Sequence, residues 1–253
     1  MYGPSYESSL IHKRPAIMAQ SVRTWLRNQK HATRDMSIED LSSIYCFRDP
    51  LRPIKNNNDI IYSPADGVIV DYSSVTSIRD SVYGKYDNVS IDKLSYGMIP
   101  EGEYDVVSIF LTFYDAHVIR IPINGVVKRL NLPPYFVENR PMLDFEKEIM
   151  NSKFVSVKKE LLTCFAYNER VLYTIYNFSE VGNMYLLLTS DYDIDTILSF
   201  VRDNQPLKQN QRLASIRYGS MATCIVPKSW KFEFVGKENT HVEAGIDSLF
   251  IYE

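Results

Sequence analysis

Residues 104–132 constrain the fold of this chain more strongly than any other stretch. They read YDVVSIFLTFYDAHVIRIPINGVVKRLNL, and their β-branched, aromatic and aliphatic residues are typical of buried strands. A break at Asp115-Ala116 divides the stretch, and the turn dipeptide Asn124-Gly125 predicts a hairpin. A chain of 253 residues that contains so much strand is long enough to bury a sizeable core between β-sheets.

Further strand-like runs lie on both sides of this stretch. Apolar runs flank the Pro-Ala-Asp-Gly turn at residues 64–67, and two more strands are expected at 170–177 and 183–190. The tail predicts two short strands around Gly236 and Gly245, whereas residues 192–204 (YDIDTILSFVRDN) predict a helix. The sequence therefore predicts an α+β fold, a β-rich single domain of mostly antiparallel sheets with a helical segment at its N-terminus.

Residues 1–55 are expected to form this N-terminal helical segment and its connection, and residues 56–253 the main domain. An amphipathic helix is expected at residues 16–30, with Val22 and Trp25 on its apolar side and several basic residues elsewhere. Ser37, followed by Asp40 three residues later, predicts the start of a second short helix. The first helix either packs on the domain or lies with its basic face on a membrane surface.

Composition limits the classes of function. With 28 basic and 31 acidic side chains the net charge is −3, which argues against nucleic-acid binding. The three cysteines, Cys46, Cys164 and Cys224, lack CxxC spacing, so we expect neither disulfides nor a metal site, and a reducing, cytoplasmic location. No secretory h-region and no apolar run of 18 residues occurs, so a membrane contact would be peripheral.

Glycine is scarce in this chain, which draws attention to the Gly219-Ser220 pair between two strand-like runs. The chain has 10 glycines, against roughly 18 expected from an average usage of about 7%. Each glycine is therefore expected to answer a requirement of the backbone. Within a strand pattern, such a requirement is a bulge or a close approach of another chain segment.

Three residues together could activate a serine. Asp66 stands in the Pro-Ala-Asp-Gly turn, His117 lies in an apolar strand, and Ser220 follows Gly219. Singly, each has an ordinary structural explanation as a turn former, a hydrogen-bonded core histidine or a small residue in a bulge. Together they supply the groups of a serine–histidine–aspartate triad, although the serine is not in a G-x-S-x-G elbow. The spacing alone does not decide whether the three side chains meet.

Several segments, in order, resemble the phosphatidylserine decarboxylase family. They are SPADGVIV, FLTFYDAHVIRIPINGVV, NERV and RYGS, preceded by SIEDLSSIYCFRDPLRPI and followed by HVEAGIDSLFIY. The resemblance spans about residues 37 to 250, nearly the whole chain.

The resemblance implies a carboxy-lyase that is made as a zymogen and acts in phospholipid metabolism. In this family the serine attacks the carbonyl of the preceding glycine, so the chain would cleave itself between Gly219 and Ser220 and leave a pyruvoyl group derived from Ser220. That group forms a Schiff base with an amino-bearing substrate and accepts electrons as carbon dioxide leaves. Asp66 and His117 would orient and deprotonate Ser220, and His117 would later return a proton.

The chain also departs from the family pattern. Arg120 stands where the family has a second histidine, and Met221 stands where it has a threonine. Arg120 is a poor base near pH 7 but binds carboxylates and phosphates well, so it is expected to bind substrate. The sequence leaves three functions open: a phosphatidylserine decarboxylase, a soluble decarboxylase of a free or peptide-borne amino acid, and an unprocessed degenerate homologue that binds a ligand or partner. It also leaves a homodimer open.

Overall fold

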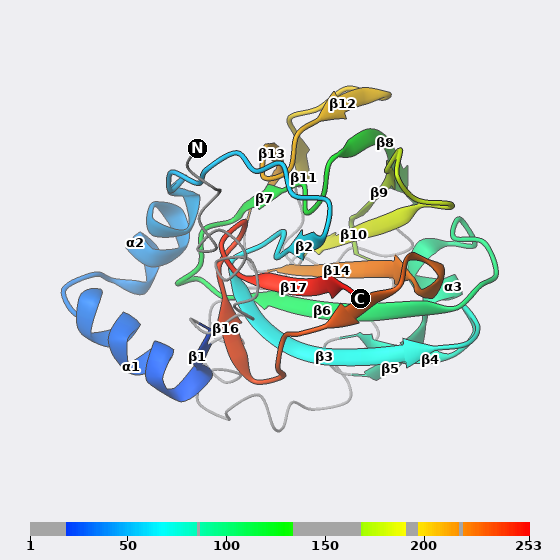
Figure 1. Ribbon diagram of the computed structural model, residues 1–253. Helices are drawn as coiled ribbons and strands as arrows, with labels where there is room; N and C mark the ends of the chain where they lie inside the picture. Colours follow the sequence, from blue (N-terminus) through cyan, green and yellow to red (C-terminus); the bar gives the residue numbers. More distant parts are fainter. Residues whose placement is uncertain (1–18, 85–86, 134–167, 191–196, 218–219) are drawn as a thin grey trace, which may run out of the picture.

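The computed structural model of the protein describes residues 19–84, 87–133, 168–190, 197–217 and 220–253 (Figure 1). Its centre is a 9-stranded sheet in the order β1-β16-β3-β6-β14-β10-β9-β8-β12, in which all neighbouring strands are antiparallel. The strands of this main sheet are β1 (Gln20–Ser21), β16 (Thr240–Val242), β3 (Gly67–Val75), β6 (Tyr104–Leu111), β14 (Ser220–Pro227), β10 (Met184–Ser190), β9 (Arg170–Tyr176), β8 (Gly125–Leu132) and β12 (Gln205–Leu207).

Two small sheets cover one face of the main sheet. The first has the order β11-β13-β7 and the second the order β15-β17-β2. Their strands are β11 (Ile197–Ser199), β13 (Arg212–Ile216), β7 (Val118–Arg120), β15 (Phe232–Phe234), β17 (Ser248–Tyr252) and β2 (Ile60–Tyr62). Ile119 and Phe250 from these sheets share one buried cluster with Val107 and Ile109 of β6, so this cluster is the principal core.

The opposite face of the main sheet is covered by a hairpin and a short helix. These are β4 (Ser81–Gly84), β5 (Asp87–Ser90) and α3 (Ile91–Ser95). Val106, the neighbour of Val107 on β6, packs here with Val82 and Leu94, because successive side chains of a strand point to opposite faces. The central strands are therefore buried on both faces, which explains why their sequences are almost continuously apolar.

The N-terminal helices pack at one end of the main sheet (Figure 1). They are α1 (Val22–Ala32), capped by Ser21, and α2 (Ile38–Ser43), where Ser37 and Asp40 form the expected capping box, followed by the 3-10 turn η1 (Tyr45–Phe47). Trp25 of α1 is buried in a third cluster with Val68 of β3 and Tyr114. Packing on the domain is thus confirmed for the apolar side of α1, whose basic residues remain exposed.

Two local predictions were wrong because pairing across the fold overrode the local pattern. Residues 197–199 form strand β11, paired with β13, where a helix over 192–204 had been expected, and residues 200–204 are not helical. Asn124-Gly125 does not close a hairpin, since β7 and β8 belong to different sheets. A Cβ on Gly125 would lie 2.7 Å from the Tyr176 carbonyl oxygen, so this glycine permits the close approach of β9.

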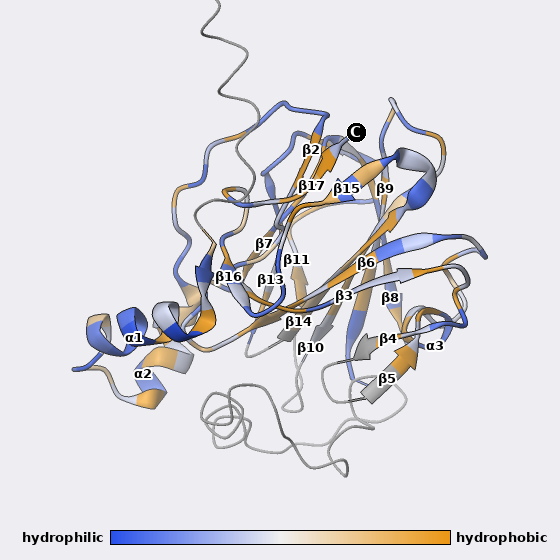
Figure 2. Ribbon diagram, turned by 60° about the horizontal axis from the view of Figure 1, so that its bottom comes forward, coloured by the Kyte–Doolittle hydropathy of each residue, from blue (hydrophilic) through white to orange (hydrophobic). Residues whose placement is uncertain are grey.

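Figure 2 shows the apolar residues concentrated along the strands and hydrophilic residues along most of the exposed connections. Among the described helices, none is long and apolar enough to cross a membrane.

Candidate active site

The segment that carries Asp66 runs beside the segment that carries His117. The backbone N–H of Tyr62 donates to the Pro122 carbonyl at 3.1 Å, and that of Arg120 donates to the Pro64 carbonyl at 2.8 Å. This is the two-residue step of an antiparallel pair. The residues that precede Asp66 therefore lie beside the residues that follow His117.

His117 directly precedes β7, and its backbone is hydrogen-bonded to two other segments. Its N–H donates to the Cys46 carbonyl at 2.8 Å, and its carbonyl accepts from the Ile216 N–H at 3.0 Å. Ile216 is the last residue of β13, and β14 begins only four residues later, at Ser220. The residue that bonds to the His117 backbone is therefore close in sequence to Ser220. The histidine is 1% exposed, which places it in the interior rather than on a strand edge open to solvent.

Ser220 is the first residue of β14, in the middle of the main sheet (Figure 1). It pairs with Leu111 of β6 on one side and with Ser190 of β10 on the other. Val68 of β3 pairs with the neighbouring Phe110 on the far side of β6. The starts of β3 and β14 therefore flank the same end of β6, two strand spacings or about 10 Å apart. Gly219 lies outside the described residues.

Gly67 explains why a glycine follows Asp66. A Cβ at this position would lie 2.4 Å from the carbonyl oxygen of Phe110, closer than any side chain tolerates. The glycine lets β3 approach β6, and this approach carries Asp66 to the sheet end where β14 begins.

Asp66 is a buried carboxyl group held by a cation. It is 4% exposed, accepts from the Ala244 N–H at 2.7 Å, and lies 3.2 and 3.3 Å from the guanidinium Nη2 of Arg52. Burial raises the pKa of Asp66, and the neighbouring Asp115 raises it further, whereas Arg52, the Ala244 N–H and His241 lower it. Asp66 thus bonds to a guanidinium and an amide rather than to an imidazole.

Arg120 lines a cavity of about 420 Å³ together with Arg52 and Arg212. Its guanidinium donates to Asp49 at 2.8 Å and to the carbonyls of Pro50 and Asn210 at 3.0 and 3.1 Å. The Nε atom of Arg52 is buried, and it has no hydrogen-bond partner among the residues that the structure describes. Asp49 also lines this cavity and pairs with both Arg120 and Arg212. Three arginines against one aspartate leave the lining of this cationic cavity with a net positive charge, which fits an anionic group. Among the described residues, the lining contains Arg120 but not His117.

The Asn-Glu-Arg segment supports the strand next to Ser220. The side-chain amide of Asn168 donates to the Ser190 carbonyl at 2.9 Å, and the Glu169 carbonyl accepts from the Ser190 N–H at 3.0 Å. Arg170 is fully buried. The segment therefore holds Ser190, the residue paired with Ser220, in place.

His241 is not among the site residues expected from the sequence, where it stands among mostly polar neighbours. In the structure His241 is 7% exposed, and its Nε2 lies 2.6 Å from Oδ1 of Asp115. Its ring stacks on Trp25 with centroids 4.1 Å apart. The burial of His241 is not evident from the sequence because most of its neighbours are charged or polar. The Thr-His-Val pattern, which is compatible with a short strand, was the feature that could have indicated it.

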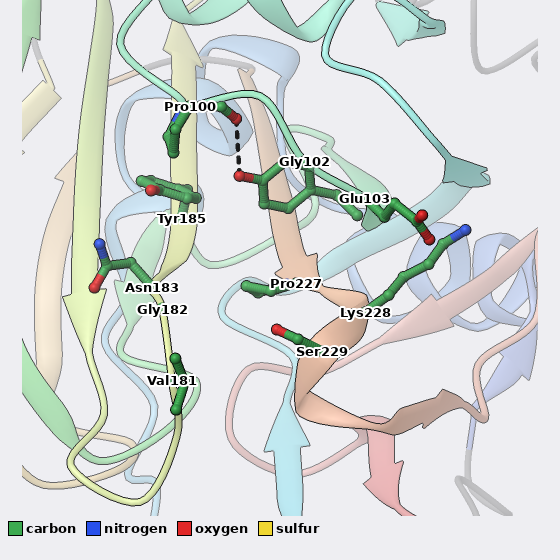
Figure 3. A pocket seen from close by; sticks show the side chains of 11 residues that line it. Pro100, Gly102, Glu103, Val181, Gly182, Asn183, Tyr185, Pro227, Lys228 and Ser229 are labelled. Atoms are coloured by element: carbon green, nitrogen blue, oxygen red, sulfur yellow. Dashed lines mark hydrogen bonds between the residues drawn. The ribbon is translucent and has the colours of Figure 1, made fainter.

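A further cavity, of about 560 Å³, lies at the opposite end of β6 and β14 and is shown in Figure 3. Tyr104, Tyr185 and Pro227 are among its lining residues, and the Tyr104 hydroxyl donates to the Pro100 carbonyl at 2.9 Å. Burial raises the pKa of Tyr104 to about 12, so this hydroxyl stays neutral near pH 7. The cavity is separated from Asp66 and Ser220 by the length of the strands.

Across the described part of the chain, no group of three or more histidine, cysteine, aspartate or glutamate side chains could hold a metal ion. Free thiols there, Cys46 and Cys224, are both buried.

Comparison with known proteins gives a consistent result. Residues 42–248 match the model of the phosphatidylserine decarboxylase family. The chain is 26% identical over 206 residues to the phosphatidylserine decarboxylase proenzyme of Carboxydothermus hydrogenoformans, covering 80% of this chain and 76% of the relative. It is 30% identical over 183 residues to that of Wolbachia sp. subsp. Brugia malayi (72% and 64%) and 28% identical over 191 residues to that of Ehrlichia chaffeensis (74% and 66%). The chain thus spans slightly less than two thirds of the length of some of these relatives.

Proposed function

Since the chain belongs to the phosphatidylserine decarboxylase family, whose members are carboxy-lyases made as proenzymes with a self-derived pyruvoyl group, we propose that it cleaves itself before Ser220 and decarboxylates phosphatidylserine. At the level of the family, the resemblance, the enzyme class and the cofactor predicted from the sequence are confirmed. The β-rich, antiparallel fold class is confirmed as well. The cleavage site, the substrate and the role of each residue belong to the proposal.

The observation that carries the proposal is the meeting of three segments at one sheet end. The residues before β3 run beside β7, β7 pairs with β13, and β13 leads into Ser220. Asp66, His117 and Ser220, although far apart in the sequence, come from these adjoining segments. Such an arrangement suits a reaction between a serine and the peptide bond before it, assisted by a histidine.

In the proposed cleavage, Oγ of Ser220 attacks the carbonyl carbon of Gly219, and the hydroxyl proton passes by way of His117 to the departing nitrogen of Ser220. The C–N bond breaks and an ester forms. Loss of the Cα proton then expels the Gly219 carboxylate and leaves a dehydroalanine residue. Tautomerisation and hydrolysis of that residue consume one water and release one ammonia, which leaves the pyruvoyl group at residue 220.

The pyruvoyl group, once formed, supplies an electron sink for the loss of carbon dioxide. The chain's own residues bind and orient the substrate and handle its protons. Arg52 and Arg120 line the cationic cavity, where the phosphate or carboxylate of an amino-bearing substrate would be held. His117 is the proposed donor of the proton that replaces the carboxylate.

We further propose that the enzyme contacts the membrane peripherally, on the cytoplasmic side, through the basic face of α1. Arg23, Arg27 and Lys30 are exposed along this helix, and its first turn has no acidic residue. Such a face is attracted to anionic lipid. Charge reversal in Arg23→Glu/Arg27→Glu should reduce co-sedimentation with phosphatidylserine vesicles, while reversal of the exposed Lys231 and Lys237 should not; equal losses would contradict this role for α1. A homodimer is a separate prediction, and analytical ultracentrifugation would test it.

Intact mass measured after prolonged incubation tests the cleavage. Wild-type protein should yield residues 1–219 and a fragment 220–253 with the mass of an N-terminal pyruvoyl group, whereas Ser220→Ala and His117→Ala should remain whole. Ser229→Ala, which changes an exposed serine, is the matched control and should cleave normally. A wild-type chain that stays whole would contradict the proposal and favour the unprocessed binding protein.

Assays of the cleaved protein then identify the substrate. Release of carbon dioxide from phosphatidylserine vesicles, with none from free serine or a serine peptide, is the expected result. Turnover of the free amino acid or the peptide alone would overturn the lipid substrate and support the soluble alternative. Arg120→Met should raise KM for the anionic substrate more than it lowers kcat, since it removes a binding group.

A further inference from the structure

The turn between β6 and β7 carries His117 from the main sheet to a small sheet, and Asp115 closes it. Oδ2 of Asp115 accepts from the backbone N–H and from the hydroxyl of Thr112, both at 2.8 Å. The Asp115 N–H donates in return to the Thr112 carbonyl at 2.9 Å. The other carboxylate oxygen, Oδ1, is bonded to Nε2 of His241 at 2.6 Å. Both oxygens are therefore engaged, one inside the turn and one outside it.

Trp25 holds the imidazole of His241 against the same turn. The two rings are stacked, with an interplanar angle of 11°. The edge of the indole also meets Tyr114, with ring centroids 6.0 Å apart. His241 thus has one face fixed by the indole while its nitrogen points at Asp115, and its rotation is restricted.

Several acidic side chains surround His241. Asp66, Asp115 and Asp247 all lie near enough for His241 to lower the pKa of their carboxyl groups. Arg52 is the cation that pairs with Asp66 and with Glu243. The 2.6 Å contact between Nε2 of His241 and Oδ1 of Asp115 is short and buried, and such a contact restricts the geometry of both side chains.

We propose that His241 is a positioning residue for the reaction: through Asp115 it fixes the turn of residues 112–117 and thereby the orientation of His117. The inference rests on the proposed function, because His117 is its target. It assigns His241 no contact with substrate. The residue proposed to do the chemistry directly precedes β7, and the residue that orients it is on β16, 124 positions later in the sequence.

Two substitutions of His241 separate the hydrogen bond from the packing. Leucine fills a similar space but donates nothing, whereas glutamine retains an N–H donor near the position of Nε2. We expect the rate of self-cleavage to fall about tenfold or more in His241→Leu and to stay within about threefold of wild type in His241→Gln. His31→Leu changes an exposed histidine of α1 and should leave the rate unchanged.

The hold of His241 and Asp115 on the turn of residues 112–117 is here called the clamp. Hydrogen exchange of the backbone amides tests the clamp independently of the chemistry. It is measured on the Ser220→Ala chain, which is expected to stay whole, with and without each His241 substitution. His241→Leu should speed exchange of the Thr112 and Tyr114 amides about tenfold or more relative to His241→Gln, and leave the Leu187 amide of the central sheet unchanged.

The outcomes distinguish the clamp from the proposed function. A wild-type chain that never cleaves refutes the proposed function, while selective exchange in the turn still supports the clamp. Unchanged exchange in His241→Leu, or an increase spread equally to Leu187, overturns the inference. It is also overturned if His241→Gln cleaves as slowly as His241→Leu.

Discussion

Replacement of Arg170 by methionine should test whether the Asn-Glu-Arg segment is structural. Arg170 is fully buried, and its guanidinium donates to backbone carbonyls from four different residues: Leu94 at 2.7 Å, Pro133 at 3.1 Å, Lys93 at 3.2 Å and Asn168 at 3.3 Å. Methionine fills much of the same space but supplies no donor. The carbonyls at the end of α3 and after β8 would then lose this partner, and that of Leu94 is buried.

The structure sets the size of the expected loss. A hydrogen bond from a charged donor contributes about 1.5–3 kcal/mol. The variant also avoids the cost of burying a guanidinium, and this gain offsets part of the loss. We therefore expect the free energy of unfolding to fall by about 3–5 kcal/mol, a large share of the total for a domain of this size.

Urea denaturation followed by circular dichroism measures this loss. The measurement is made in a Ser220→Ala background, where the chain is expected to remain whole and unfolding to involve one polypeptide. Arg129→Met, on the exposed face of β8, is the matched control and should change the free energy by less than about 0.5 kcal/mol. If Arg170→Met costs less than about 1 kcal/mol, the segment does not support the fold as described.

Three further predictions concern the same part of the molecule. Gly67→Ala should destabilise the chain by about 2–4 kcal/mol in the same urea assay, because the new Cβ would force β3 and β6 apart; a neutral result would contradict the close approach. The native pKa of Asp115 is lowered from 3.8 and that of Asp66 is raised from 3.8. Asp115 should therefore make stability fall as the pH drops below about 4, and Asp66 should make it fall as the pH rises above about 4. The free energy of unfolding, measured with urea between pH 3 and 7, should lose the corresponding pH dependence in Asp115→Asn and in Asp66→Asn. An unchanged pH dependence in either variant would contradict the pKa shift of that carboxyl group. Burial raises the pKa of the Cys224 thiol, so iodoacetamide at pH 8 should label this residue in unfolded but not in native protein, as read by peptide mass; rapid native labelling would show that β14 is open.

The long central strands of the main sheet could be predicted from the sequence because their own residues carry the signal. Leu186 and Leu187 face different clusters on the two sides of the sheet, so both must be apolar whatever their neighbours are. The helix expected over residues 192–204 failed for the opposite reason. Ile197 and Leu198 are equally compatible with a helix, and only the partner strand β13, which lies later in the chain, decides for a strand.

The candidate site was predictable where residues are adjacent to a diagnostic turn or pair, as Asp66 and Ser220 are. His241 was not, because its importance depends on Asp115 and Trp25, which are distant in the sequence and approach it only through the pairing of β16 with β3. The partner of Asp66 was missed for a similar reason, since Arg52 reaches it from the N-terminal connection. Pairings that depend on the packing of separate segments leave little trace in a single sequence.

The central place of β14 determines what the proposed cleavage would release. Residues 220–253 supply β14 between β6 and β10, β16 between β1 and β3, and both β15 and β17 of a small sheet that also contains β2. A break before Ser220 would thus leave two polypeptides interleaved in two sheets, with a shared core and no separate folding unit for the shorter one. Native size-exclusion chromatography would not tell the zymogen from its products, because the pieces would separate only when the sheets unfold.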